Sequence, residues 1–88
     1  MTKFKVLLHR RAESFLGKLD ANKRNRIADK LKELEEFPGP KLDLTKIAGE
    51  EDTFRLRIGK YRALFKIYSK ENIIVIVNID LRKRVYRS

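Results

Sequence analysis

Hydrophobic and charged residues alternate along residues 53–68, and this alternation sets the expected fold. Phe54, Leu56 and Ile58 occupy every second position with arginines between them, which is typical of a strand with one buried face. Gly59 and the lysine after it suit a two-residue turn of type II′, because such a turn needs a positive φ at its first central position. The stretch therefore predicts a tight β-hairpin.

The register of this hairpin brings basic side chains together. A two-residue turn pairs Ile58 with Tyr61 and therefore sets Arg57 opposite Arg62. Side chains directly opposite one another share a face of the sheet, so Arg55 is expected on the same face as this pair. Like charges in such positions repel, and an anion between them would offset the repulsion. This is the first indication of function.

The segments before the hairpin predict one strand and two helices. Residues 3–9 begin as an alternating strand. Apolar residues within 12–19 fall on one face of a short helix, and those within 27–34 on one face of a second helix. Asp20 is a suitable N-cap for the second helix. The helical region ends at residues 37–40 (Phe-Pro-Gly-Pro), since a residue before proline is pushed out of the α region.

The remaining segments complete an α+β domain. Residues 41–52 predict a loop, in which Lys41 and Lys46 are candidates for phosphate contacts. Residues 73–79 are apolar on both faces, as a central strand would be. The order β-α-α-β-β-β predicts a single domain, residues 1–88, with an antiparallel sheet and a helical hairpin packed on one face.

Composition excludes several classes of site. The chain has no cysteine and a single histidine, His9, so a disulfide framework, a thiolate metal site and a His-rich metal site are excluded. We expect no metal and no cofactor, and we expect His9 to lie at the surface or cap a helix. No apolar run approaches the roughly 20 residues of a membrane span, and the N-terminus lacks the apolar core of a signal peptide. These observations predict a soluble, cytoplasmic protein without a membrane partner.

The net charge of +10 is unevenly distributed. Residues 1–52 carry a balance of +2, whereas residues 53–88 carry +8 with only two acidic side chains. A basic half of this kind is typical of proteins that bind nucleic acid or the ribosome. The alternative is a solvated surface rich in lysine and glutamate. Residues 1–52 fit that alternative. Residues 53–88 favour polyanion binding, because most of their basic side chains have no acidic partner within that half of the chain.

Two motifs resemble the RelE/ParE superfamily of bacterial and archaeal toxins. The hairpin segment FRLRIGKYR, residues 54–62, is similar to the family pattern yRlRvGdYR, and RKRVY, residues 82–86, is similar to its R-K-x-V-Y ending. The order of elements also matches over nearly the whole chain. RelE-type members are ribosome-dependent endoribonucleases that cut mRNA in the A site by metal-independent attack of a ribose 2′-OH. The resemblance therefore implies mRNA, the ribosome and a cognate antitoxin as partners.

The resemblance also assigns catalytic roles. Arg62 matches the arginine that clamps the scissile phosphate, and Arg82 matches a second basic position that contacts the transition state or the leaving group. Tyr86 matches a tyrosine that carries a proton or stacks on a base. Arg55 and Arg57 stand where the best-known active members carry lysines. Because arginine stays protonated in proteins, these two can stabilise charge but can hardly serve as a general base.

A second departure concerns Leu81, which stands where many relatives place a histidine just before the arginine of the ending. Without that histidine the resemblance implies a slower enzyme or one that depends on Tyr86. A structural pairing of Arg62 with Asp80 or Glu71 is the alternative to its catalytic role. The other cations assigned to RNA contacts are Lys46, Lys60, Lys83, Arg84 and Arg87.

Two other functions remain open at this stage. A ParE-like toxin would inhibit DNA gyrase by binding, without nuclease chemistry, and the absent lysines and histidine favour it. A non-catalytic RNA-binding domain would show an affinity that falls steeply with salt and would cut no RNA.

Overall fold

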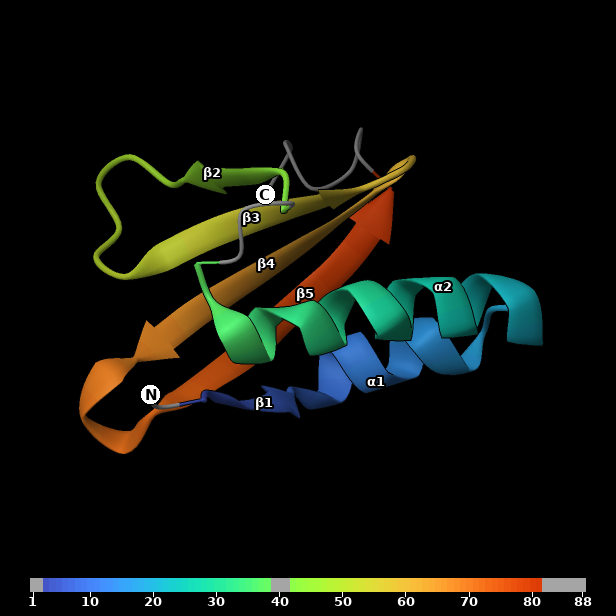
Figure 1. Ribbon diagram of the computed structural model, residues 1–88. Coiled ribbons are helices and arrows are strands. Elements are labelled where there is room, and N and C mark those ends of the chain that lie inside the picture. Colours follow the sequence, from blue (N-terminus) through green and yellow to red (C-terminus); the bar gives the residue numbers. More distant parts are fainter. Residues whose placement is uncertain (1–2, 39–41, 82–88) are drawn as a thin grey trace.

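The computed structural model describes residues 3–38 and 42–81, and these form a five-stranded sheet with helices on one side (Figure 1). In chain order the elements are β1 (Lys5–Leu8), α1 (Arg10–Gly17), α2 (Ala21–Lys32), the 3-10 helix η1 (Glu33–Glu36), β2 (Leu44–Lys46), β3 (Thr53–Ile58), β4 (Tyr61–Tyr68), the 3-10 helix η2 (Ser69–Glu71) and β5 (Ile73–Leu81). The strands lie in the order β1-β5-β4-β3-β2. This arrangement confirms the predicted α+β class.

The sheet differs from the prediction in two places. Strand β1 pairs with β5 in parallel, and the long connection between them, which contains α1, α2 and strands β2 to β4, permits this parallel pairing. The segment predicted as a loop contains β2, which pairs antiparallel with β3 and sets Leu44 opposite Leu56. Leu56 is fully buried and Leu44 packs against the core, so burial of Leu44 favours an extended strand there.

Both helices begin with side-chain caps that the sequence indicated. Nδ1 of His9 accepts a hydrogen bond from the backbone N–H of Arg11 at 3.1 Å, so His9 is the N-cap of α1. Asp20 caps α2, its Oδ1 accepting from the N–H of Lys23 at 3.0 Å. These bonds satisfy donors that the first turn of a helix leaves open. No helix in the described ranges is both long and apolar enough to cross a membrane.

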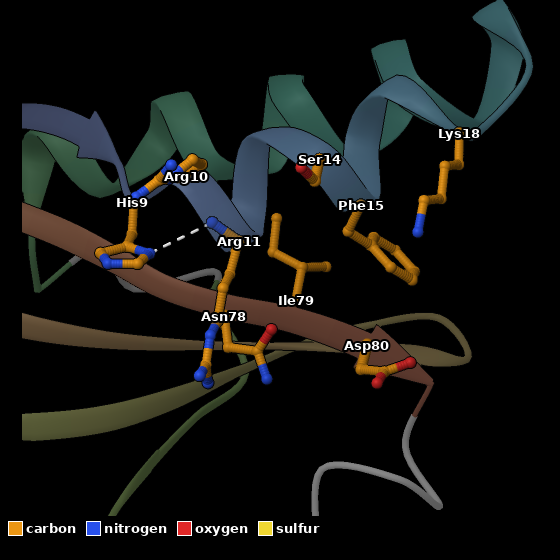
Figure 2. Close-up of a pocket in the computed structure, with 9 residues that line it drawn as sticks. All are labelled: His9, Arg10, Arg11, Ser14, Phe15, Lys18, Asn78, Ile79 and Asp80. Atoms are coloured by element: carbon orange, nitrogen blue, oxygen red, sulfur yellow. Dashed lines mark hydrogen bonds between the residues drawn. The ribbon is translucent and has the colours of Figure 1, made fainter.

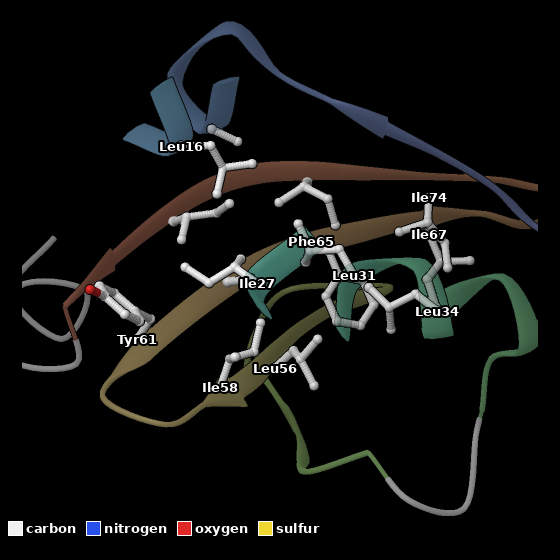
Figure 3. Packing of buried hydrophobic residues seen from close by; sticks show 14 residues of the cluster. Leu16, Ile27, Leu31, Leu34, Leu56, Ile58, Tyr61, Phe65, Ile67 and Ile74 are labelled. Atoms are coloured by element: carbon white, nitrogen blue, oxygen red, sulfur yellow. The ribbon is translucent and has the colours of Figure 1, made fainter. Parts of the chain in front are cut away.

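The core lies between the helices and the facing side of the sheet (Figure 3). Helical residues Ile27 and Leu34 are fully buried there, as is Phe65 from β4. Phe37, which follows η1, packs its ring edge-on against Phe65 at a centroid distance of 6.0 Å. The helices therefore cover one face of the sheet and leave the other face without a helical layer among the described residues.

Candidate nucleic-acid interface

The β3–β4 hairpin has the register that the alternation predicts. Ile58 lies opposite Tyr61 and Arg57 lies opposite Arg62, across a turn in which Gly59 has a φ of +57°. A positive φ at the first central position is what a type II′ turn requires. The predicted juxtaposition of the two arginines is confirmed at the level of the backbone.

Arg55, Arg57 and Arg62 form what we call the arginine face, on the side of the sheet opposite to the helices. The neighbouring residues Leu56 and Ile58 point into the core, with 0% and 4% of their surface exposed. Successive side chains on a strand point to opposite faces, so the three arginines share the other face. Arg57 is exposed and Arg55 half-buried, whereas Arg62 is only 7% exposed. A buried guanidinium interacts more strongly with an anion, because little water screens it.

Two carboxylates adjoin the arginine face, and neither was part of the predicted site. Nε of Arg57 lies 4.0 Å from Oδ2 of Asp43, and the backbone N–H of Arg57 donates to the carbonyl of Asp43 at 2.9 Å. Both side chains of this ion pair are about half exposed or more, so the pair is weak. Asp80 on β5 lies directly opposite Arg62. Any anion that approached Arg57 would therefore compete with Asp43.

The strand pairing also distinguishes between Asp80 and Glu71, the two carboxylates predicted as structural partners of Arg62. Asp80 occupies the neighbouring position on β5, whereas Glu71 lies in η2, beyond the far end of β4. The six residue steps along β4 from Arg62 to Tyr68 span roughly 20 Å. The sequence had indicated Asp80 as one of two partners for Arg62, and the pairing of β5 with β4 places Asp80, the residue after Ile79, beside Arg62.

Two cations assigned to RNA contacts do not join the arginine face. Lys46 lies opposite Phe54, whose ring stacks on Phe65 in the core, so the register directs Lys46 to the helix side of the sheet. Nζ of Lys60 lies 5.8 Å from the centre of the Tyr61 ring, and Tyr61 belongs to the core. The alternation along β3 predicted which side chains share the arginine face. It does not extend to Lys60 in the turn or to Lys46 in the segment before β3, so it could not assign either lysine to a face of the sheet.

Comparison with known proteins places this chain in a family. The family model for the ParE toxin of the type II toxin-antitoxin system, parDE, matches residues 6–86. A chain of the archaeal RelE–RelB complex from Pyrococcus horikoshii OT3 is 30% identical, with 96% of this chain and 99% of that chain covered and a TM-score of 0.79. This chain belongs to the RelE/ParE toxin family. The RelE1 protein of Methanocaldococcus jannaschii is 28% identical over 98% of both chains.

Relatives outside the archaea share the RelE/ParE fold. A chain of the RelBE2 toxin–antitoxin complex of Mycobacterium tuberculosis is 26% identical and has a TM-score of 0.75, with 93% of this chain and 94% of that chain covered. The isolated RelE toxin of E. coli, at 21% identity and a TM-score of 0.72, covers 97% of this chain with 92% of its own and shows the fold alone. The mixed five-stranded sheet is thus the family's architecture rather than a peculiarity of this member.

Several predicted site residues of this RelE/ParE member lie outside the described residues. Strand β5 ends at Leu81, opposite Tyr61, one position beyond the row that contains Arg62 and Asp80. The predicted roles of the residues that follow remain predictions, as does that of Lys41 in the segment before β2. The predicted site residues after β5 are Arg82, Lys83, Arg84, Tyr86 and Arg87.

Proposed function

We propose that this chain is the toxin of a toxin–antitoxin pair and cleaves mRNA in the A site of the ribosome. The observation that carries the proposal is Arg57 directly opposite Arg62, with Arg55 on the same face of the hairpin. Like charges in directly opposed positions destabilise a sheet, and a bound phosphate converts this repulsion into attraction. The basic second half of the chain supports the same substrate.

The proposed reaction is attack of a ribose 2′-OH on the adjacent phosphate. The O–P bond to the 2′ oxygen forms as the bond to the 5′ oxygen breaks, which gives a 2′,3′-cyclic phosphate and a free 5′-OH. Arg62, assisted by Arg57, stabilises the charge that builds on the phosphoryl oxygens. Neither can take up the proton of the 2′-OH, since arginine does not deprotonate in proteins. We assign to Tyr86 the transfer of the 2′-OH proton to the departing 5′ oxygen, and proton transfer of this kind contributes about 10²- to 10⁴-fold in rate.

A cognate antitoxin is the proposed partner that holds this activity in check in the cytoplasm. The related chain from Pyrococcus horikoshii OT3 was crystallised in a RelE–RelB complex, and the Methanococcus jannaschii relative in a RelB–RelE antitoxin–toxin complex. The net charge of +10 favours an antitoxin with an acidic toxin-binding segment.

Programmed ribosomes test the proposed cleavage. Wild-type protein should cut mRNA within the A-site codon, and Arg62→Ala should cut about 10²- to 10³-fold more slowly, as expected when a transition-state donor is removed. Arg62→Lys should fall between the two, because lysine keeps the charge but loses the bidentate geometry. Lys32→Ala, an exposed cation on α2, is the matched control and should cut normally. Circular dichroism must first show that Arg62→Ala, a change at a buried position, still folds. Absence of cleavage by the wild type, or undiminished cleavage by folded Arg62→Ala, would contradict the proposal.

Inhibition of DNA gyrase is the second candidate function. The family model that matches residues 6–86 is that of the ParE toxin, and arginines replace lysines at positions 55 and 57. Under this alternative the purified protein would inhibit supercoiling by gyrase and leave translation in an extract intact. The two assays, run on one preparation, separate the candidates.

A further inference from the structure

A cavity of about 620 Å³ lies between α1 and the C-terminal half of β5 (Figure 2). It exists because β1 is short: its pairing with β5 stops at Ile76, and from there β5 continues beside α1 without a neighbouring strand on that edge among the described residues. The volume falls in the range of small-molecule binding sites. The cavity lies apart from Arg55 and Arg57, which do not line it.

One wall of the cavity is basic. Arg10, Arg11 and Lys18 from the α1 region line it, and all three are exposed. Their side chains form no hydrogen bond or ion pair with any described residue. Three cations that gather at a hollow and form no ion pair with a described residue favour an anionic ligand.

The opposite wall carries groups that a simple anion site would not contain. The amide of Asn78 and the carboxylate of Asp80 line the cavity from β5. Oδ1 of Asp80 accepts from the N–H of Leu81 at 2.7 Å, and Oδ2 accepts from no described residue. Figure 2 shows Arg11 extending toward Asn78, while Phe15 and Lys18 lie at the end of the cavity near Asp80. The Phe15 ring is held edge-on by Tyr61 at a centroid distance of 5.8 Å.

These groups together define the chemistry of the ligand. Inorganic phosphate or an acidic peptide would be attracted by the basic wall but repelled by Asp80, and neither would use the ring of Phe15. A nucleotide has a negative phosphate, an aromatic face for Phe15 and an edge with N–H donors for Asp80. Guanine alone among the four RNA bases presents two adjacent N–H donors that a carboxylate can accept together.

We propose that this cavity binds a nucleotide of single-stranded RNA. The base lies against Phe15 with its N–H edge toward Asp80, and the phosphates lie along Arg10, Arg11 and Lys18. Guanine is the preferred base. This inference rests on the proposed function only in naming RNA as the source of the nucleotide. Binding of a nucleotide in the cavity does not require the protein to cleave RNA.

The test measures binding by the purified protein without ribosomes. Tetranucleotides rG4, rA4, rC4 and rU4, together with the four free 5′-monophosphates, are titrated by NMR and fluorescence anisotropy. The wild type should bind rG4 more tightly than rA4 by about 5- to 100-fold, the discrimination of one two-point base contact. Asp80→Asn should abolish that preference, because an asparagine whose Oδ1 accepts from Leu81 turns its N–H donors toward the N–H donors of the base. Arg11→Gln should weaken all four tetranucleotides about equally and reduce the salt dependence.

Two substitutions on α2 serve as controls for the changes at Asp80 and Arg11. Asp29→Asn and Lys32→Gln change exposed charges on α2 and should leave affinity and base preference unchanged. Binding of guanosine monophosphate with the same response to Asp80→Asn, but no binding of rG4, would support the cavity and identify free nucleotides as its ligand. No nucleotide binding at millimolar concentration, or a preference for guanine that survives in Asp80→Asn, would overturn the inference.

Failure of this inference and failure of the proposed function give different results. Ribosome-dependent cleavage by a protein that binds neither the tetranucleotides nor the monophosphates overturns only the cavity. Guanine-selective binding by a protein that cuts nothing on ribosomes overturns only the nuclease.

Discussion

Replacing Gly59 by alanine tests the turn that sets the register of the arginine face. Gly59 has a φ of +57°, a conformation that costs an L-residue about 1–2 kcal/mol. An added methyl group would meet no atom within 4 Å, so steric contact contributes nothing and backbone strain is the whole effect. We expect Gly59→Ala to lower the free energy of unfolding by this amount.

Gly17 provides a matched control with the opposite sign. It is the last residue of α1, its φ lies outside the left-handed region, and a methyl group there would also meet no atom within 4 Å. Alanine at a helical position is favoured over glycine by about 0.5–1 kcal/mol, so Gly17→Ala should stabilise the protein. For a domain of this size 1 kcal/mol corresponds to about 4–8 °C in Tm, so the two variants should move Tm in opposite directions.

Urea unfolding followed by circular dichroism measures both free energies, and an unchanged m-value would show that the unfolded state is not altered. A synthetic chain with D-alanine at position 59 should recover most of the lost stability, because a D-residue favours positive φ. Shifts of the same sign for Gly59→Ala and Gly17→Ala, or equal stability of the D- and L-alanine proteins, would refute the assigned turn geometry.

Two other predictions concern the core and the arginine face. Ile27→Ala empties a fully buried position beneath α2 and should lower the free energy of unfolding by about 2–5 kcal/mol in urea titrations; a loss below about 1 kcal/mol would show that α2 packs differently. Asp43→Asn removes the carboxylate beside Arg57 and should tighten binding of single-stranded RNA. In anisotropy titrations, the affinity should fall more steeply with salt, by the amount expected for one additional phosphate contact. The free energy of unfolding should change by less than about 1 kcal/mol. Weaker RNA binding by Asp43→Asn would show that Asp43 positions Arg57 rather than competing for it.

The hairpin was predictable because local chemistry fixes it. Alternating Phe54, Leu56 and Ile58 determine which face is buried, and Gly59 determines the length of the turn, so the Arg57–Arg62 pair follows without knowledge of the rest of the fold. The caps His9 and Asp20 were predictable for the same reason, since a cap bonds to a donor within three residues of itself.

What sequence reasoning missed depends on contacts between distant segments. The parallel pairing of β1 with β5 joins residues that are more than 60 positions apart, and no local pattern specifies it. Strand β2 has only three residues, too few for alternation to be recognised, and it is held by its pairing with β3. The cavity beside α1 forms because β1 ends early relative to β5. Since this depends on the pairing of β1 with β5, the cavity could not be predicted from the sequence either.

Asp80 connects the arginine face with the cavity, because it lies opposite Arg62 in the β4–β5 pairing and also lines the cavity beside α1. Its replacement by asparagine therefore has two consequences of opposite sign. Removal of a negative charge beside Arg62 should strengthen phosphate binding whatever the sequence, while loss of the carboxylate should weaken the preference for guanine. A carboxylate that merely neutralised Arg62 would produce the first effect without the second. Affinity and base preference measured together in Asp80→Asn therefore distinguish an acid that only balances charge from one that also contacts a base.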